Sequence, residues 1–136
     1  DPRYAPTAYQ RELVAAGRLG RKSGRGVYAY AADGTAEGAT ADPDEVARLL
    51  AAGPAGNPVT RTLAMLVNEA VDLVDRGEAG SADVDLAMTL GTGYPKGPIA
   101  WGRELGFTVV RDQLRELDAA YPGGRYRPSP ALDQIS

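Results

Sequence analysis

The sequence predicts an all-α protein with one short extended segment near residues 27–30. Apolar residues recur at helical spacing in residues 59–76 and again in 107–121. The stop signals Gly77 and Pro122 follow these stretches. Hydrophobic residues make up 43% of the chain, which is typical of a globular protein. Because amphipathic helices are marginal alone, we expect them to pack on one another in a small orthogonal or bundle-like domain.

One helix and one turn are expected at the start of the chain. Thr7 can cap a helix that runs to about Ala16. The glycine-rich turn at residues 23–26 then leads into the β-prone run 27–30.

A loose connection is expected next. Residues 31–41 are small and polar without periodicity, which predicts a linker or a mobile loop. Asp42 as a cap and Pro43 at the first helical position then start a short helix that ends near Ala52. The predicted organisation is therefore a closing segment at 1–30, a linker with a short helix at 31–57, and a main helical body at 58–136.

The main body should begin with two helices. In the first, residues 59–76, the apolar side chains form one stripe and polar side chains such as Asn68 fall largely opposite. Ser81 is the expected cap of the second helix. Asp83 and Asp85 follow in its first turn, where negative charge suits the helix dipole.

The rest of the main body alternates loops and helices. Gly91 is expected to end the second helix and to start a loop that reaches Pro98. A short helix from Ile99 to Leu105 follows. A longer helix then presents an apolar face, and a last helix can begin near Ser129. The residues of that apolar face are Phe107, Val110, Leu114, Leu117 and Tyr121.

Composition excludes several kinds of chemistry. The net charge of −3 disfavours nucleic acid or an anionic membrane as a partner. Histidine and cysteine are absent, so imidazole bases, thiolate nucleophiles and thiolate ligands are excluded. The apolar stretches are too short to span a membrane. The absence of cysteine fits a cytoplasmic location. We expect no catalytic, cofactor or metal site within the chain. It begins with Asp1-Pro2, which reads as the middle of a longer chain or a processed product.

Two regions are candidates for contacts. Arg18, Arg21, Lys22 and Arg25 form a dense basic corner, which is either a solvated turn or a binding site for phosphate groups. The glycines around this corner do not fit a nucleotide-binding loop.

The second region surrounds Trp101, the single tryptophan. With Tyr94, Pro95 and Pro98 it forms a rigid aromatic segment. These four residues are candidates for a protein interface, and core packing is the alternative.

A short internal sequence repeat suggests a duplicated module. Residues 3–7, Arg-Tyr-Ala-Pro-Thr, resemble residues 125–129, Arg-Tyr-Arg-Pro-Ser. In both, an Arg-Tyr pair precedes a proline and a cap residue. The simplest interpretation is the tail of one copy followed by a second copy, and chance similarity is the alternative.

Residues 62–105 resemble the C-terminal helical domain of 3-hydroxyacyl-CoA dehydrogenases. The resemblance is strongest in the D-x-A-M helix at 85–88 and the G-x-x-Y-P-x-G-P loop at 91–98. Residues 16–28 resemble the segment that closes such a domain. This implies a fold of the 6-phosphogluconate dehydrogenase C-terminal-like type. It also implies a parent enzyme, similar to 3-hydroxybutyryl-CoA dehydrogenase, with a Rossmann domain and two helical modules.

The resemblance also implies what the chain would lack. In this family NAD oxidises the 3-hydroxyl group of an acyl-CoA, as in fatty-acid β-oxidation, and the catalytic His and Glu lie on the nucleotide-binding domain. Members of this family carry an asparagine near the substrate, at the start of the first long helix of the helical domain. Thr60 aligns with that asparagine, which makes Thr60 the substrate-proximal candidate. The implied partners are the Rossmann domain, the first helical module and a second protomer. Acyl-CoA would be bound only through the parent enzyme.

Overall fold

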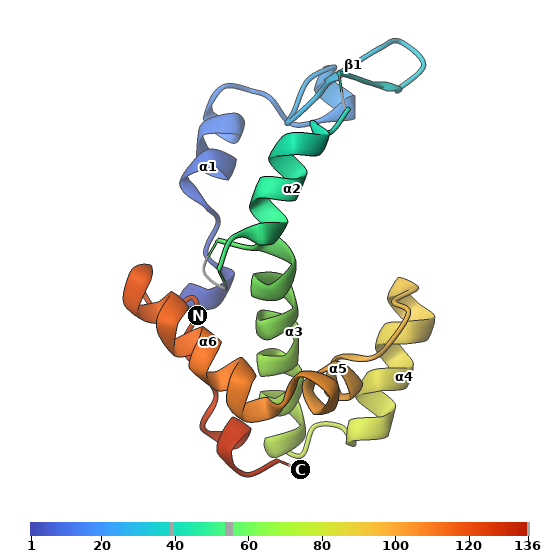
Figure 1. Ribbon diagram of the computed structural model, residues 1–136. Coiled ribbons are helices and arrows are strands. Elements are labelled where there is room, and N and C mark those ends of the chain that lie inside the picture. The colour runs from blue at the N-terminus through green and yellow to red at the C-terminus, as the bar shows by residue number, and fades with distance from the viewer. Residues whose placement is uncertain (39, 54–55, 136) are drawn as a thin grey trace. The chain divides into compact units, whose positions relative to one another are not determined.

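A computed structural model describes residues 1–38, 40–53 and 56–135, and these residues are mainly helical, which confirms the all-α class (Figure 1). They divide into an N-terminal unit, residues 3–46 with Asp1, and a C-terminal unit, residues 47–136 with Pro2. The elements, with η for a 3-10 helix, are η1 (Pro2–Tyr4), α1 (Ala8–Ala15), η2 (Arg21–Ser23), β1 (Ala29–Tyr30), β2 (Ala36–Glu37), α2 (Pro43–Ala51), α3 (Pro58–Asp75), α4 (Ser81–Thr92), α5 (Pro98–Leu105), α6 (Phe107–Ala120) and η3 (Pro130–Asp133).

The predicted caps of the first two α-helices are confirmed. Thr7 and Gln10 form a capping box at α1: the Gln10 N–H donates to Thr7 Oγ1, and the Thr7 N–H donates to Gln10 Oε1 over 2.7 Å. Asp42 Oδ1 accepts the Asp44 N–H at 3.0 Å, with Pro43 as the first residue of α2. Both helices end within one residue of their predicted ends.

The extended segment is shorter than predicted. Only Ala29 and Tyr30 form a strand, because the Gly26 N–H donates to the Tyr28 carbonyl and folds the preceding residues into a turn. The partner strand, Ala36–Glu37, lies in the stretch predicted to be a loop. The prediction of loop throughout 31–41 was therefore wrong at this strand, since a pair of two-residue strands is too short to leave a periodic pattern.

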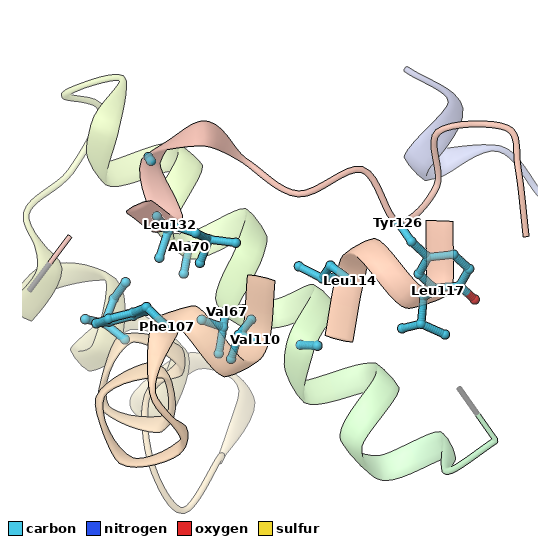
Figure 2. Close-up of a cluster of buried hydrophobic side chains, with 12 residues drawn as sticks. Val67, Ala70, Phe107, Val110, Leu114, Leu117, Tyr126 and Leu132 are labelled. Carbon is cyan, nitrogen blue, oxygen red and sulfur yellow. The ribbon is translucent and has the colours of Figure 1, made fainter. Parts of the chain in front are cut away.

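Helix α3 is the centre of the C-terminal unit. Asn57 caps it by accepting the Val59 N–H at 2.9 Å and the Thr60 N–H at 3.3 Å. Helices α5 and α6 both pack against α3, and η3 closes over α3 and α6. Figure 2 shows the shared core, whose members are Ala64, Val67, Ala70, Val71, Ile99, Phe107, Val110, Leu114, Leu117, Tyr126, Ala131 and Leu132. The predicted apolar face of α6 therefore lies in this core except for Tyr121, which is exposed.

Asn68 lies inside this unit rather than on its polar side, so its predicted position was wrong. It is 2% exposed. Its Oδ1 accepts the Ser129 N–H at 2.7 Å and its Nδ2 donates to the Arg127 carbonyl at 3.2 Å. Ser129 in turn donates from its hydroxyl to Asp72 Oδ1 at 3.0 Å. A polar side chain is stable at this buried position because both ends of its amide are hydrogen-bonded.

The predicted ends of α4 were each wrong by a short distance. Gly80, not Ser81, occupies the N-cap position, and no side chain caps the helix there. The helix continues through Gly91 to Thr92, because the left-handed conformation that ends it falls on Gly93 (φ 70°).

Candidate functional site

The aromatic segment forms a shallow apolar groove on the C-terminal unit. The rings of Tyr94 and Trp101 lie 5.6 Å apart and tilted by 47°. With one side of α3 they line a groove of about 390 Å³, whose lining residues are Pro58, Val59, Thr62, Leu63, Leu66, Tyr94 and Trp101. A surface of this kind suits an apolar partner.

A carboxylate from α4 fixes the helix that carries Trp101. Asp85 accepts hydrogen bonds from the Ile99 N–H at 2.7 Å and the Ala100 N–H at 3.0 Å, so it caps α5 rather than its own helix. This differs from the prediction that Asp85 serves the dipole of α4. The close approach requires Gly97, because a Cβ there would lie 2.2 Å from Asp85 Oδ1.

The four interface candidates differ in exposure. Pro98 is buried as the first residue of α5, and Pro95 is exposed in the loop. Tyr94 and Trp101 are half-buried, with faces in the groove. The arrangement leaves Tyr94, Pro95 and Trp101 available to a partner and gives Pro98 a structural position.

Thr60, the substrate-proximal candidate, lies in the first turn of α3. Its hydroxyl donates to the Asn57 carbonyl at 3.2 Å, within its own helix terminus. Its side chain is half-buried and does not line the aromatic groove. In this position Thr60 contributes to the start of α3.

Arg61 is held between two tyrosines. Its guanidinium carbon lies 5.1 Å from the centre of the Tyr121 ring and 5.8 Å from that of Tyr126. These distances are typical of cation–π contacts. Since Tyr126 belongs to the repeated Arg-Tyr-x-Pro segment, this stacking joins the start of α3 to the tail of the module.

Replacing Arg61 with methionine should lower the free energy of unfolding by about 0.5–2 kcal/mol, because the cation is lost while most of the apolar stem is kept. Urea unfolding followed by circular dichroism measures the change. Arg115→Met is the matched control. Arg115 is exposed, and its ion pair with Asp112, at 3.5 Å, is a weak surface pair. We therefore expect the free energy of unfolding to change by less than about 0.5 kcal/mol. Equal losses in the two variants would contradict a role for the stacking.

The basic corner lies on the surface of the N-terminal unit. Arg21, Lys22 and Arg25 are exposed, and the Arg21 guanidinium lies 5.8 Å from the centre of the Tyr30 ring. The turn is fixed by Ser23, which accepts the Leu19 N–H and donates to the Arg25 carbonyl at 2.8 Å. The cations are therefore carried by an ordered turn, and the alternative of a phosphate-binding corner remains a prediction.

Within residues 1–38, 40–53 and 56–135, no group of three or more acidic side chains is placed to hold a metal ion. No helix in the same part of the chain is long and apolar enough to cross a membrane. Sequence reasoning missed the functions of Asp85 and Asn68, because each acts on residues distant in the sequence. An exposed apolar face on α4 was also missed.

Three comparisons place the chain among known proteins. Residues 56–136 match the family described as 3-hydroxyacyl-CoA dehydrogenase, C-terminal domain. A 3-hydroxyadipyl-CoA dehydrogenase of Escherichia coli K12 is 29% identical over an alignment of 210 positions, which covers 98% of this chain and 44% of that protein. The human mitochondrial hydroxyacyl-coenzyme A dehydrogenase is 38% identical over 80 residues, 57% of this chain and 25% of that enzyme.

The fold comparison agrees. The crystal structure of 3-hydroxybutyryl-CoA dehydrogenase from Escherichia coli K12 matches with a TM-score of 0.70 and 28% identity, over 98% of this chain and 44% of that one. The chain thus spans less than half the length of these relatives. Because the 210 aligned positions outnumber the 136 residues here, the Escherichia coli relative carries residues within the aligned stretch that this chain lacks.

Proposed function

This chain belongs to the 3-hydroxyacyl-CoA dehydrogenase family through its C-terminal domain, and from that premise we propose that it is a non-catalytic helical part of an NAD-dependent enzyme of this kind. Its tasks are to pack against the other domains and to help close the acyl-CoA cleft. The observation that carries the proposal is that the C-terminal unit has a packed helical core while the chain contains no histidine. Hydride transfer and NAD binding are assigned to the Rossmann domain of the parent enzyme.

The described residues do not fit NAD. A dinucleotide site of the expected type needs a parallel sheet whose strand leads through G-x-G-x-x-G into a helix. The strands described here are two residues long and antiparallel, and neither glycine cluster follows such a strand. The chain's own part in the reaction is therefore one of packing and positioning.

The proposed domain organisation explains the surface of the N-terminal unit. Among its described residues Leu13 is the one buried large hydrophobic, while Tyr4 (70% exposed), Tyr9, Val14 and Leu19 are exposed. A closing segment of a preceding helical module would bury such side chains against that module. In the C-terminal unit Tyr126, the tyrosine at the matching position of the repeated segment, is 7% exposed, which supports the proposal that Tyr4 would be buried against the preceding module.

The proposal also includes the predicted domain boundaries and the candidate residue near the substrate. Residues 1–30 are assigned to the end of a first helical module, 31–57 to the linker, and 58–136 to a second module. Thr60 stays a substrate-proximal candidate, although its hydroxyl already serves the Asn57 carbonyl. Dimerisation and a cytoplasmic location stay predictions of the sequence.

Activity of the isolated chain tests the proposal. The purified chain, given NADH and acetoacetyl-CoA, is expected to consume no NADH above the protein-free rate, because it lacks a general acid with an imidazole-like pKa and a dinucleotide site. A complete dehydrogenase of the family is the positive control. Turnover comparable to that control would show that the chain is an enzyme by itself.

A further inference from the structure

The basic corner concentrates positive charge in a chain that is acidic elsewhere. Residues 1–30 carry six basic and two acidic side chains, whereas residues 31–136 carry nine basic and sixteen acidic ones. The stretch 13–32, which contains the whole corner, has no carboxylate side chain. A surface that serves solubility alone usually mixes charges of both signs. The separation of charge therefore favours a site for an anion at this corner. Its four cations are Arg18, Arg21, Lys22 and Arg25.

None of these four side chains pairs with a carboxylate within the part of the chain that the structure describes. In the C-terminal unit, by contrast, Arg76, Lys96 and Arg111 each form an ion pair. The Arg18 Nε–H is shielded from solvent, yet it has no hydrogen-bond partner among the described residues. Buried donors are normally satisfied, and a charged one is costly to leave unpaired. An anionic ligand oxygen beside Arg18 would satisfy this donor.

The main chain of the corner holds the cations close together. The Gly20 N–H donates to the Arg25 carbonyl at 2.9 Å, which closes a tight turn. The two sides of this turn are in contact, because a Cβ at Gly26 would lie 2.8 Å from the Gly20 Cα. The Arg21 guanidinium lies over the Tyr30 ring, and in this position it keeps its N–H donors for an anion. Because the cations are already gathered on an ordered turn, binding an anion costs less conformational entropy.

We propose that the basic corner binds a small anion whose phosphate groups lie close together, as they do in the nucleotide end of coenzyme A or in a nucleoside triphosphate. Three guanidinium groups and one ammonium group offset the charge of several phosphates, and each guanidinium can donate two parallel hydrogen bonds to one of them. A single phosphate would engage only part of the corner. The site goes beyond the packing role proposed for the chain, because it assigns a ligand to the N-terminal unit.

Isothermal titration calorimetry of the purified chain at low ionic strength tests the site, with coenzyme A, ATP, pantetheine and inorganic phosphate as probes. We expect coenzyme A, ATP or both to bind, and inorganic phosphate to bind at least about 10-fold more weakly because it meets fewer cations. Pantetheine, which carries no phosphate, should not bind. An affinity for coenzyme A at least about 10-fold above that for ATP identifies the coenzyme as the ligand, and any other ratio identifies nucleotide phosphates in general.

Removal of two cations tests the residues of the corner. Lys22→Gln combined with Arg25→Gln should weaken binding of the tighter probe by about 30-fold or more, because two charge-assisted contacts are lost. The matched control combines Arg103→Gln with Arg115→Gln, which lowers the net charge equally. Both arginines are exposed and belong to the C-terminal unit. The control should bind the probe within about 2-fold of the wild type, because charges outside the site act only through screened long-range fields.

Amide NMR spectra of the wild-type chain locate the site without any substitution. On titration with the tighter probe, the largest shift changes should fall within residues 18–30. The same spectra of each variant verify that it is folded. The proposal is overturned if neither coenzyme A nor ATP binds at about 1 mM, if the corner variant binds like the wild type, or if the largest changes fall outside residues 18–30. Inorganic phosphate or pantetheine that binds as tightly as the nucleotides also overturns it, since clustered phosphates would then not be what the corner recognises.

Discussion

Replacing Gly97 with alanine should lower the free energy of unfolding of the C-terminal unit by about 2–4 kcal/mol, through overpacking and loss of a helix cap. A Cβ at this position would lie 2.3 Å from Asp85 Cβ and 2.2 Å from Asp85 Oδ1. The carboxylate would have to withdraw from the Ile99 and Ala100 N–H groups, which it now bonds at 2.7 and 3.0 Å. Urea unfolding at low protein concentration measures the loss.

Gly91→Ala is the matched control for this prediction. Gly91 lies in α4, and a Cβ there would meet no atom within 4 Å. Alanine should therefore be neutral or stabilise the helix by up to about 1 kcal/mol, because glycine is the poorer helix former.

Asp85→Ala separates the two contributions to the Gly97 effect. Alone it should cost about 0.5–2 kcal/mol, the usual range for a lost cap. In that background Gly97→Ala should cost less than in the wild type, because no cap remains to be displaced. Additive costs would mean that Gly97 and Asp85 act independently.

Asn68→Ala is expected to cost about 2–4 kcal/mol, since it removes two hydrogen bonds and leaves the buried Ser129 N–H without its acceptor. The groups affected are the Ser129 N–H and the Arg127 carbonyl. Hydrogen exchange should show lost protection at the Ser129 amide together with lower global stability in urea. Tail residues such as Leu132, 2% exposed at present, should become more accessible.

Asp75→Ala is the control on the same helix. Asp75 is exposed near the C-terminus of α3, where a negative charge opposes the helix dipole. Its removal should change stability by less than about 0.5 kcal/mol and leave exchange at Ser129 as in the wild type. Unaltered protection at Ser129 in Asn68→Ala would show that the tail is held by other contacts.

Local signals predicted the helices well. The cap at Thr7, the start at Pro43 and the apolar face of α6 depend on residues within a few positions of each other, and such patterns are visible in one sequence. The errors at α4 have a local cause too. Gly91 and Gly93 could each end that helix, and only the backbone conformation at Gly93 shows which one does.

The contacts that organise the candidate site could not be predicted in this way. Asp85 bonds residues 14 and 15 positions away, and Asn68 bonds residues 59 and 61 positions away. No helical or strand period relates such distances. The resemblance gave the motif of an acidic helix and a Pro-Gly loop, and the structure supplies the physical reason that its aspartate and glycine occur together.

The distance in sequence between Asn68 and the tail has a consequence for rates. Closing a loop of this length costs entropy before any contact is gained, so the tail should dock after α3, α5 and α6 have assembled. Interactions formed after the transition state slow unfolding and hardly change folding. The hydrogen bonds that Asn68 makes to the tail should therefore slow unfolding, and their loss should shorten the lifetime of the folded state.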